Sequence, residues 1–199
     1  MTGETERVVL LARHGETEWN LAGRWQGGTD VRLSDAGRAQ ARALAEKLRG
    51  HAPALAGVYA SDLDRAFETA SIVATLLRLP TPRREPRLRE RGFGCFEGLT
   101  REECAAQFPE AWARYLDDRR STPPGAEPQE AIVARVVAAM QEIAGAAGTD
   151  GGPHLVVSHG GAIRTFAHAA LGVVLPPVGN GAVFRIAYAG GQFRSIDEI

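Results

Sequence analysis

Cysteine and lysine are both scarce in this sequence of 199 residues. The two cysteines, Cys95 and Cys104, are too few for a disulfide framework and lack the paired spacing of a zinc site. Lys47 is the only lysine, so the positive charge is almost all arginine, which a skewed genome composition explains without any appeal to function. Since nothing indicates an oxidising compartment, we expect a cytoplasmic protein.

An excess of one charge and long apolar runs are also absent. Lys and Arg number 23 against 24 for Asp and Glu, so the net charge of -1 argues against broad binding of nucleic acid. A local cationic pocket remains compatible with that sum. The amino-terminal residues 1–12 carry acidic side chains where a signal peptide needs basic ones, and their apolar run is too short to span a bilayer. We therefore expect neither a targeting segment nor a membrane partner.

Short apolar runs alternate with amphipathic segments along the chain, which predicts an α/β fold. The length and the 44% hydrophobic content fit one domain, residues 1–199, with no internal repeat. We expect strands at Val8–Ala12, Val58–Ala60, 83–88, Leu155–Val157, Ala182–Tyr188 and Gln192–Ile196. We expect helices capped by Ser34 and stopped by Gly50, capped by Asp64 and ending near Leu77, beginning at Thr100 with Glu103 in capping-box spacing, and at about 129–144 and 162–171.

Residues that can bind a ligand or take part in chemistry follow several of the expected strands. Open α/β sheets bind ligands at the carboxyl ends of their strands, so these residues are predicted to converge. They are Arg13 and His14 after the first strand, Ser61, Asp62 and Arg65 after the second, Arg89 and Glu90 after the third, and Ser158, His159, Gly160 and Gly161 after the fourth.

This set of side chains suits phosphoryl transfer. Arg13 and Arg65 can each direct two N–H donors at phosphate oxygens. A neutral imidazole is a competent nucleophile when its second nitrogen is hydrogen-bonded, and Glu90 can supply a proton to the leaving oxygen.

Other chemistries have weaker support. The sequence contains no phosphate loop of the GxxxxGK[ST] type, no GxGxxG after a strand and no GxSxG elbow. His154 and His159 would face opposite sides of a strand, so we expect no catalytic metal.

The string LLARHGETEWN at 10–20 resembles the signature of the histidine phosphatase superfamily, the phosphoglycerate mutase-like family. The resemblance extends over nearly the whole chain, in the expected order. The other matching segments are RWQGGTDVRLSDAGRAQA at 24–41, VYASDLDRAFETA at 58–70, LRERGFGCFEGLT at 88–100, PPGAEPQEAIVARV at 123–136 and VVSHGGAIR at 156–164.

This resemblance implies a three-layer α/β/α sandwich around a mixed, mostly parallel sheet, and a two-step reaction through a phosphohistidine. It assigns His14 as the nucleophile and Glu90 as the general acid that later activates water. Arg13, Arg65 and His159 would form the phosphate pocket.

Further binding residues follow from the same resemblance. Asn20, in the position of the asparagine of RHGxTxxN, would donate to a phosphate oxygen, and Gly160 would offer a backbone N–H. From their position in the loop after the nucleophile, Gln26 and Gly27 are expected to contact the substrate, and Trp25 either contacts the leaving group with them or anchors the loop. No cofactor is implied, and the expected substrate is a small phosphomonoester.

The segment at about 93–128 is expected to form a helical cap-like insertion. Its aromatic residues either line the pocket or pack the cap onto the sheet, and packing is favoured. They are Phe96, Phe108, Trp112 and Tyr115.

The family contains both phosphatases and mutases, so the shared core does not choose between them. Glu90 and His159 are 69 positions apart, closer than in cofactor-dependent phosphoglycerate mutases, and the GFGCFEG motif resembles the phosphatase branch. A metal-independent phosphatase is therefore the favoured interpretation. The alternatives are a cofactor-dependent mutase and a catalytically silent phosphate-binding module. Because many members dimerise, a homodimer is the oligomer that the resemblance suggests.

Overall fold

Six strands form one mixed sheet in the order β3-β2-β4-β1-β5-β6. The computed structural model describes residues 6–51, 55–148 and 152–199. The strands are β1 (Arg7–Arg13), β2 (Gly57–Ala60), β3 (Arg83–Arg84), β4 (His154–Ser158), β5 (Val183–Ala189) and β6 (Gln192–Glu198). Residues 1–5, part of the segment that argues against a signal peptide, lie outside the described ranges.

The central strands run parallel and end at the same edge of the sheet. β4 lies between β1 and β2, with Arg13 opposite Ser158 and Ala60 opposite Val157. β5 and β6 join the other side of β1 in antiparallel orientation. The residues that follow β1, β2 and β4 are thereby brought together, as the sequence predicts.

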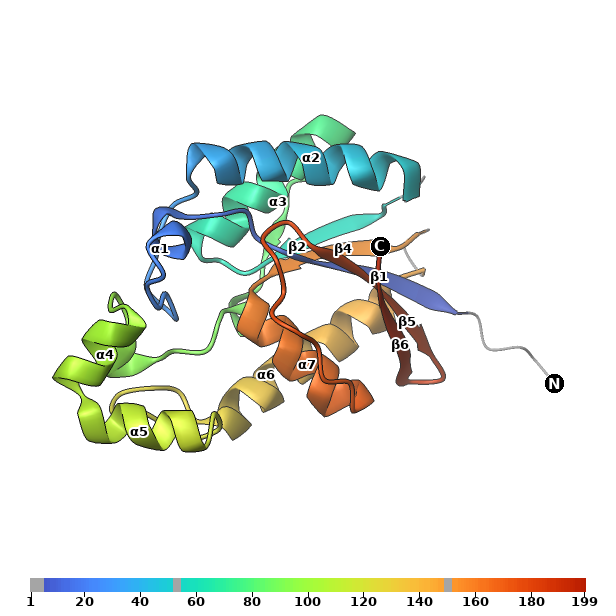
Figure 1. Cartoon of the computed structure of the whole chain (residues 1–199). Helices are drawn as coiled ribbons and strands as arrows, with labels where there is room; N and C mark the ends of the chain where they lie inside the picture. Colours follow the sequence, from blue (N-terminus) through green and yellow to red (C-terminus); the bar gives the residue numbers. More distant parts are fainter. Residues whose placement is uncertain (1–5, 52–54, 149–151) are drawn as a thin grey trace.

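Helices cover both faces of the sheet, which confirms the expected three-layer α/β/α sandwich (Figure 1). The helices α2 (Asp35–His51) and α3 (Asp64–Leu77) cover one face, and α6 (Gln129–Ala146) and α7 (Gly160–Leu171) cover the other. Side chains of β1 alternate between the two cores: Leu10 and Ala12 pack with α2 and α3, whereas Val9 and Leu11 pack with α6 and α7. A strand buried on both faces needs an uninterrupted apolar run, which is the pattern seen in the sequence.

A third apolar cluster lies in the segment between Glu90 and α6. It contains the helices α4 (Arg101–Gln107) and α5 (Pro109–Asp117) and the 3-10 turn η2 (Gly94–Phe96). The capping box at the start of α4 is present, because Thr100 and Glu103 exchange side-chain and backbone hydrogen bonds. Of these four aromatic residues, Phe96, Trp112 and Tyr115 are buried and Phe108 packs against them. They pack within the cap and against Trp25, in a cluster separate from the two on the sheet, and not onto the sheet as expected. Tyr115 also lines the cleft described below.

Several boundaries differ from the sequence-based expectations. The expected third strand over 83–88 is wrong beyond Arg84, because Pro86 begins a 3-10 turn, η1 (Pro86–Leu88). Asp64 is the first residue of α3 rather than its cap, and the N-cap residue is Leu63. The helix after Ser34 continues through Gly50 to His51. A single turn, α1 (Glu18–Leu21), was not expected, although Thr17 and Asn20 form its capping box.

No helix in the described ranges combines the length and the apolar character needed to cross a membrane.

Candidate active site

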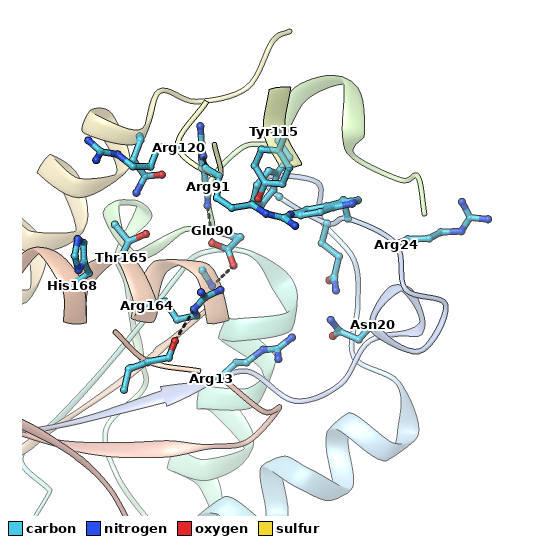
Figure 2. A pocket seen from close by; sticks show the side chains of 18 of the residues that line it. Arg13, Asn20, Arg24, Glu90, Arg91, Tyr115, Arg120, Arg164, Thr165 and His168 are labelled. Atoms are coloured by element: carbon cyan, nitrogen blue, oxygen red, sulfur yellow. Dashed lines mark hydrogen bonds between the residues drawn. The ribbon is translucent and has the colours of Figure 1, made fainter. Parts of the chain in front are cut away.

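A cleft of about 800 Å³ opens at the carboxyl ends of β1, β2 and β4. Figure 2 shows Arg13 and Glu90 facing this cleft from different segments, with Arg120 and His168 on one side and Asn20 and Arg24 on the other. The sequence-predicted residues that line it are Arg13, His14, Asn20, Gln26, Gly27, Arg65 and Glu90, together with Trp25. Sheet topology has therefore gathered into one cavity residues that lie up to 162 positions apart in the chain, from Arg13 to Leu175.

His14 is held in one tautomer at the end of β1. Its ring is 3% exposed, and Nδ1 lies 2.6 Å from the carbonyl oxygen of Gly15. A carbonyl can only accept, so Nδ1 carries the hydrogen and Nε2 keeps its lone pair. Burial, with Arg65 and Arg13 nearby, holds the pKa of His14 well below the ordinary value of 6.5. The imidazole is thus neutral at physiological pH and can act as a nucleophile.

Arg65 and Arg13 are buried guanidinium groups with donors left over. The Nη atoms of Arg65 donate to the carbonyl oxygens of Gly27 and Thr29, both at 2.8 Å, while Arg13 donates through Nη1 to Val178. The Nε atoms of both arginines are buried and have no hydrogen-bond partner among the described residues. Burial lowers the pKa of Arg65 to about 10, which still leaves it positive at neutral pH. Two cationic donors are therefore oriented by the protein and remain available to an anion.

His159 lies beside His14, with the two ring centroids 5.0 Å apart. It is 0% exposed, and its Nε2 lies 2.8 Å from the hydroxyl of Ser61. The Nδ1 atom has no partner among the described residues. Burial first, then the neighbouring Arg65, His14 and arginines such as Arg13, hold its pKa well below 6.5, so this imidazole is also neutral.

The carboxylate of Glu90 is fixed by two backbone amides. The N–H of Gly161, in the first turn of α7, donates to Oε2 at 2.8 Å, and the N–H of Arg91 donates to Oε1 at 2.9 Å. A Cβ at Gly161 would lie 2.4 Å from Oε1, so only glycine allows this approach. Gly160, by contrast, lies against Arg13, whose Nε would be 3.4 Å from a Cβ there. Glu90 is thus held at the cleft by backbone N–H groups, and neither of these two contacts comes from a charged side chain.

The loop after β1 supplies the remaining cleft residues. The Oδ1 atom of Asn20 accepts from the Thr17 N–H at 3.1 Å and from Asn180 at 3.3 Å, which leaves the donor end of the amide for the cleft. Gly27 has a positive φ of 52°, and a Cβ there would lie 2.1 Å from Glu97. Gln26 is 9% exposed, and its Oε1 has no partner among the described residues.

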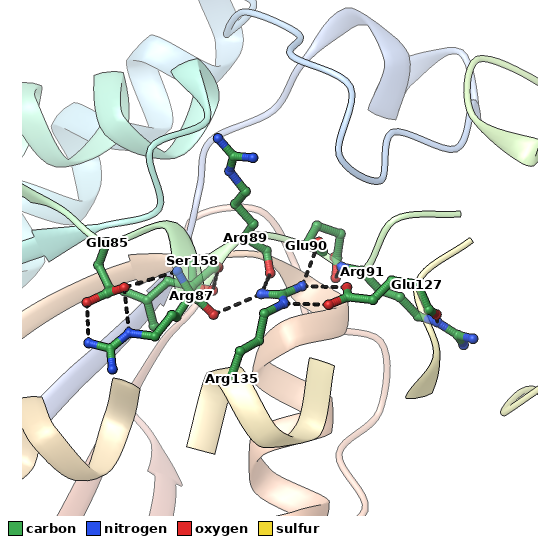
Figure 3. A network of polar contacts seen from close by, with 9 residues as sticks. Glu85, Arg87, Arg89, Glu90, Arg91, Glu127, Arg135 and Ser158 are labelled. Atoms are coloured by element: carbon green, nitrogen blue, oxygen red, sulfur yellow. Dashed lines mark hydrogen bonds and ion pairs between the residues drawn. The ribbon is translucent and has the colours of Figure 1, made fainter. Parts of the chain in front are cut away.

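A polar network behind the cleft fixes the segment that carries Glu90 (Figure 3). Arg135 of α6 donates to the carbonyl oxygens of Arg87, Arg89 and Glu90 at 2.6–3.0 Å. The same guanidinium forms a double ion pair with Glu127, both contacts at 2.7 Å. Arg89 itself turns away and pairs with Asp62 at 2.6 Å, so it does not line the cleft. Bidentate contacts of this kind restrict the backbone on both sides of Glu90.

The cleft is strongly cationic although the chain as a whole is nearly neutral. Eight arginines and one carboxylate, that of Glu90, line it. The arginines are Arg13, Arg24, Arg65, Arg91, Arg101, Arg119, Arg120 and Arg164. Within the described ranges, no group of three or more His, Cys, Asp and Glu side chains is placed to hold a metal ion. The cavity is therefore electrostatically suited to an anion.

Sequence reasoning missed the residues that support this cleft from distant positions. Three of them are Arg135, Asn180 and Thr69, which accepts from the Gly15 N–H. Arg135 and Thr69 lie in the matching segments 123–136 and 58–70 but were given no role there. Ser61 and Gly161 were noted only for their place after a strand, without a role. The repeated glycine of SHGG was a usable signal, since two adjacent glycines at a strand end indicate a close approach by another group.

Comparison with known proteins identifies relatives along almost the whole chain. A sequence model described as the histidine phosphatase superfamily (branch 1) matches residues 9–197. Glucosyl-3-phosphoglycerate phosphatase of Mycolicibacterium vanbaalenii is 36% identical over 193 residues, which cover 91% of this chain and 84% of that protein. Metal-independent phosphoserine phosphatase of Arabidopsis thaliana is 37% identical over 158 residues, which cover 78% of this chain and 65% of that protein.

A solved structure shares the fold as well. Mycobacterial glucosyl-3-phosphoglycerate phosphatase in complex with VO3 superposes with a TM-score of 0.84 at 30% identity, covering 96% of this chain and 97% of that one.

Proposed function

The chain belongs to the histidine phosphatase superfamily and is a small-molecule phosphatase, and we propose that it hydrolyses phosphomonoesters without a metal ion, through a phosphohistidine at His14. The observation that carries the proposal is the set of buried nitrogen atoms near His14 that have no hydrogen-bond partner among the described residues. Nε of Arg13, Nε of Arg65 and Nδ1 of His159 come from three different segments and surround a nucleophile whose tautomer is already fixed. Preorganised donors of this kind stabilise the charge of a transferring phosphoryl group.

In the first step, Nε2 of His14 attacks phosphorus as the bond to the leaving oxygen breaks. The leaving oxygen takes a proton from the carboxyl group of Glu90, which gives the alcohol and an N–P bond at His14. Arg13, Arg65 and His159 hold the equatorial oxygens, and Asn20 and the Gly160 N–H add neutral donors. In the second step, water gives its proton to the Glu90 carboxylate and attacks phosphorus, which releases phosphate and restores both residues.

The cleft and the relatives both support a small substrate. The cleft volume of about 800 Å³ leaves room beyond the phosphate for a leaving group, and Trp25, Gln26 and Gly27, which line the cleft, would contact that group. The relatives are named for a glucosyl-3-phosphoglycerate and for phosphoserine, both small phosphomonoesters. We therefore assign a small polar phosphomonoester to this chain.

The decisive experiment measures phosphate release from a panel of phosphomonoesters with EDTA present. We expect turnover to survive EDTA in the wild type and to be abolished in His14→Ala, and a phosphoryl adduct to be trapped by mass spectrometry in the wild type alone. Full activity in His14→Ala would overturn the assignment of the nucleophile. Isomerisation of phosphoglycerate with little phosphate release would instead indicate a mutase, and tight phosphate binding without turnover would indicate a silent module.

The role of Glu90 has its own test, because protonation matters only for poor leaving groups. Glu90→Gln is expected to slow the hydrolysis of alkyl phosphates by roughly 10² to 10⁴. The same variant should slow the hydrolysis of p-nitrophenyl phosphate much less, since its p-nitrophenolate leaving group needs little protonation. Equal losses on the two substrates would contradict the assignment.

Two further expectations from the sequence stay predictions. A cytoplasmic location is tested by fractionating cells that express the tagged chain, and a homodimer by light scattering on the purified protein.

A further inference from the structure

The second histidine of the site, His159, has one hydrogen-bond partner on its ring, the hydroxyl of Ser61. The sheet makes this contact possible although the two residues are 98 positions apart. Ala60 and Val157 are paired across β2 and β4, and the N–H of Ser61 continues the ladder by donating to the Val157 carbonyl at 3.0 Å. Ser61 and His159 follow these strands at the same edge. Both are 0% exposed, so water does not compete for their hydrogen bonds.

The direction of the hydrogen bond between them follows from counting protons. A serine hydroxyl has one hydrogen to donate and two lone pairs to accept with. The backbone N–H of Leu63 already points at the Ser61 oxygen, at 3.4 Å. If Nε2 of His159 also carried a hydrogen, the oxygen would accept twice, and its own hydrogen would find no acceptor among the contacts of the described residues. Leaving a buried donor unsatisfied costs about 1–3 kcal/mol.

The charge state of the ring completes the count. His159 faces Arg13 and His14 from the end of β1, Arg65 from α3 and Arg135 from α6, and none of these groups favours a second proton on it. The imidazole therefore carries a single hydrogen. If Ser61 donates to Nε2, as the count requires, that hydrogen lies on Nδ1, the atom for which the described part of the chain offers no partner.

We infer that Ser61 is a positioning residue that holds neutral His159 in the Nδ1–H tautomer, so that the ring presents a hydrogen-bond donor to the phosphate beside His14. His159 then contributes to phosphate binding without being protonated. The tautomer is a property of the free protein, whereas the contact with phosphate rests on the proposed function. The two claims can therefore fail separately.

The test reads the tautomer directly, by long-range ¹H–¹⁵N correlation on the ¹⁵N-labelled full chain near neutral pH. The sequence has five histidines, and the signals of His159 are assigned by comparison with His159→Gln. We expect the pattern of an Nδ1–H imidazole in the wild type. An Nε2–H or a doubly protonated pattern would overturn the inference without the use of any Ser61 variant.

Three variants then ask whether Ser61 is the cause. Ser61→Ala should shift His159 toward the Nε2–H form, and Ser61→Thr should restore the wild-type pattern, because threonine keeps the hydroxyl. Ser158→Ala is the matched control, since it removes a neighbouring buried hydroxyl, 1% exposed, that donates to the Leu88 carbonyl and not to the ring. An unchanged tautomer in Ser61→Ala, or the same shift in Ser158→Ala, would show that Ser61 does not set it.

Inorganic phosphate, titrated into the same samples, tests whether the Nδ1–H group of His159 contacts phosphate. Loss of one aligned donor should weaken phosphate binding by roughly tenfold in Ser61→Ala, with recovery in Ser61→Thr. Unchanged phosphate affinity together with a shifted tautomer would refute the contact with phosphate while leaving the tautomer assignment in place. A chain that hydrolyses no phosphomonoester but shows the Nδ1–H pattern would count against the proposed function alone.

Discussion

Gly161 controls where the carboxylate of Glu90 can lie. Its N–H donates to Oε2, and its missing side chain leaves the space that Oε1 occupies. A methyl group at position 161 would overlap the Glu90 carboxylate. The carboxylate would have to move, because residue 161 lies in the backbone of helix α7, which is more rigid than the Glu90 side chain. One small residue thus sets the position of the proposed acid.

Gly161→Ala is accordingly expected to reduce kcat on alkyl phosphates by about 10²-fold, which is the same kind of loss as in Glu90→Gln. The rate of p-nitrophenyl phosphate hydrolysis should fall less, because that leaving group needs little protonation. Gly145→Ala is the matched control, because Gly145 is also helical and has open space around its Cβ position. That control should keep its activity and gain roughly 0.5–1 kcal/mol of stability. Equal activity in Gly161→Ala and the wild type would contradict the steric argument.

Helix α6 holds the segment with Glu90 through one side chain. Arg135 links the backbone carbonyls of Arg87, Arg89 and Glu90 to Glu127, and both charged side chains are about four-fifths buried. Because α6 is packed into the core under β1, this network transmits the rigidity of the helix to the segment with Glu90. The acid is therefore positioned by an element that contributes no reacting group.

Arg135→Met should cost about 2–4 kcal/mol of stability, since it leaves Glu127 and three carbonyls without their donor. It should also lower kcat, because the backbone around Glu90 loses its restraint. Urea unfolding and steady-state kinetics measure the two effects. Arg87→Met is the comparison, as Arg87 is more exposed and pairs with Glu85 and Glu142, and it should cost less than about 1 kcal/mol. Similar losses in both variants would argue against a special role of the network.

At the scale of the whole molecule, the stability depends on pH through two of the buried histidines, His14 and His159. The pKa values of His14 and His159 lie below the ordinary 6.5 in the folded state, so the unfolded chain binds protons that the native chain does not. The contribution of these two histidines to the free energy of unfolding is therefore complete above about pH 6.5 and is lost as the pH falls below that value. Each histidine contributes a slope of up to about 1.4 kcal/mol per pH unit.

Urea unfolding between about pH 7.5 and 5.5 measures this slope. His159→Gln should reduce the slope, because one of the histidines with a lowered pKa no longer titrates. A slope that is absent in the wild type, or unchanged in the variant, would contradict the buried neutral state of these rings.

The sequence by itself determined the class of the fold, the positions of most helices and strands, and part of the cleft lining, whose arginines other than Arg13 and Arg65 it did not identify. These properties are local or are carried by motifs: Val9 to Ala12 is apolar because both faces of β1 are buried, and Thr100 with Glu103 forms its capping box within four residues. Boundaries such as the end of β3 depended on pairing with β2, which periodicity does not contain.

Only the tertiary structure decided which distant groups meet. The contacts of Ser61 with His159, of Gly161 with Glu90 and of Arg135 with the Glu90 carbonyl join positions 98, 71 and 45 residues apart. Strand order, parallel register and the seating of α6 and α7 on the sheet create them. No local pattern encodes such contacts, because their energy depends on the position of both partners in the folded chain. The chemical groups of the site are thus readable in the sequence, whereas their protons and orientations are set by the fold.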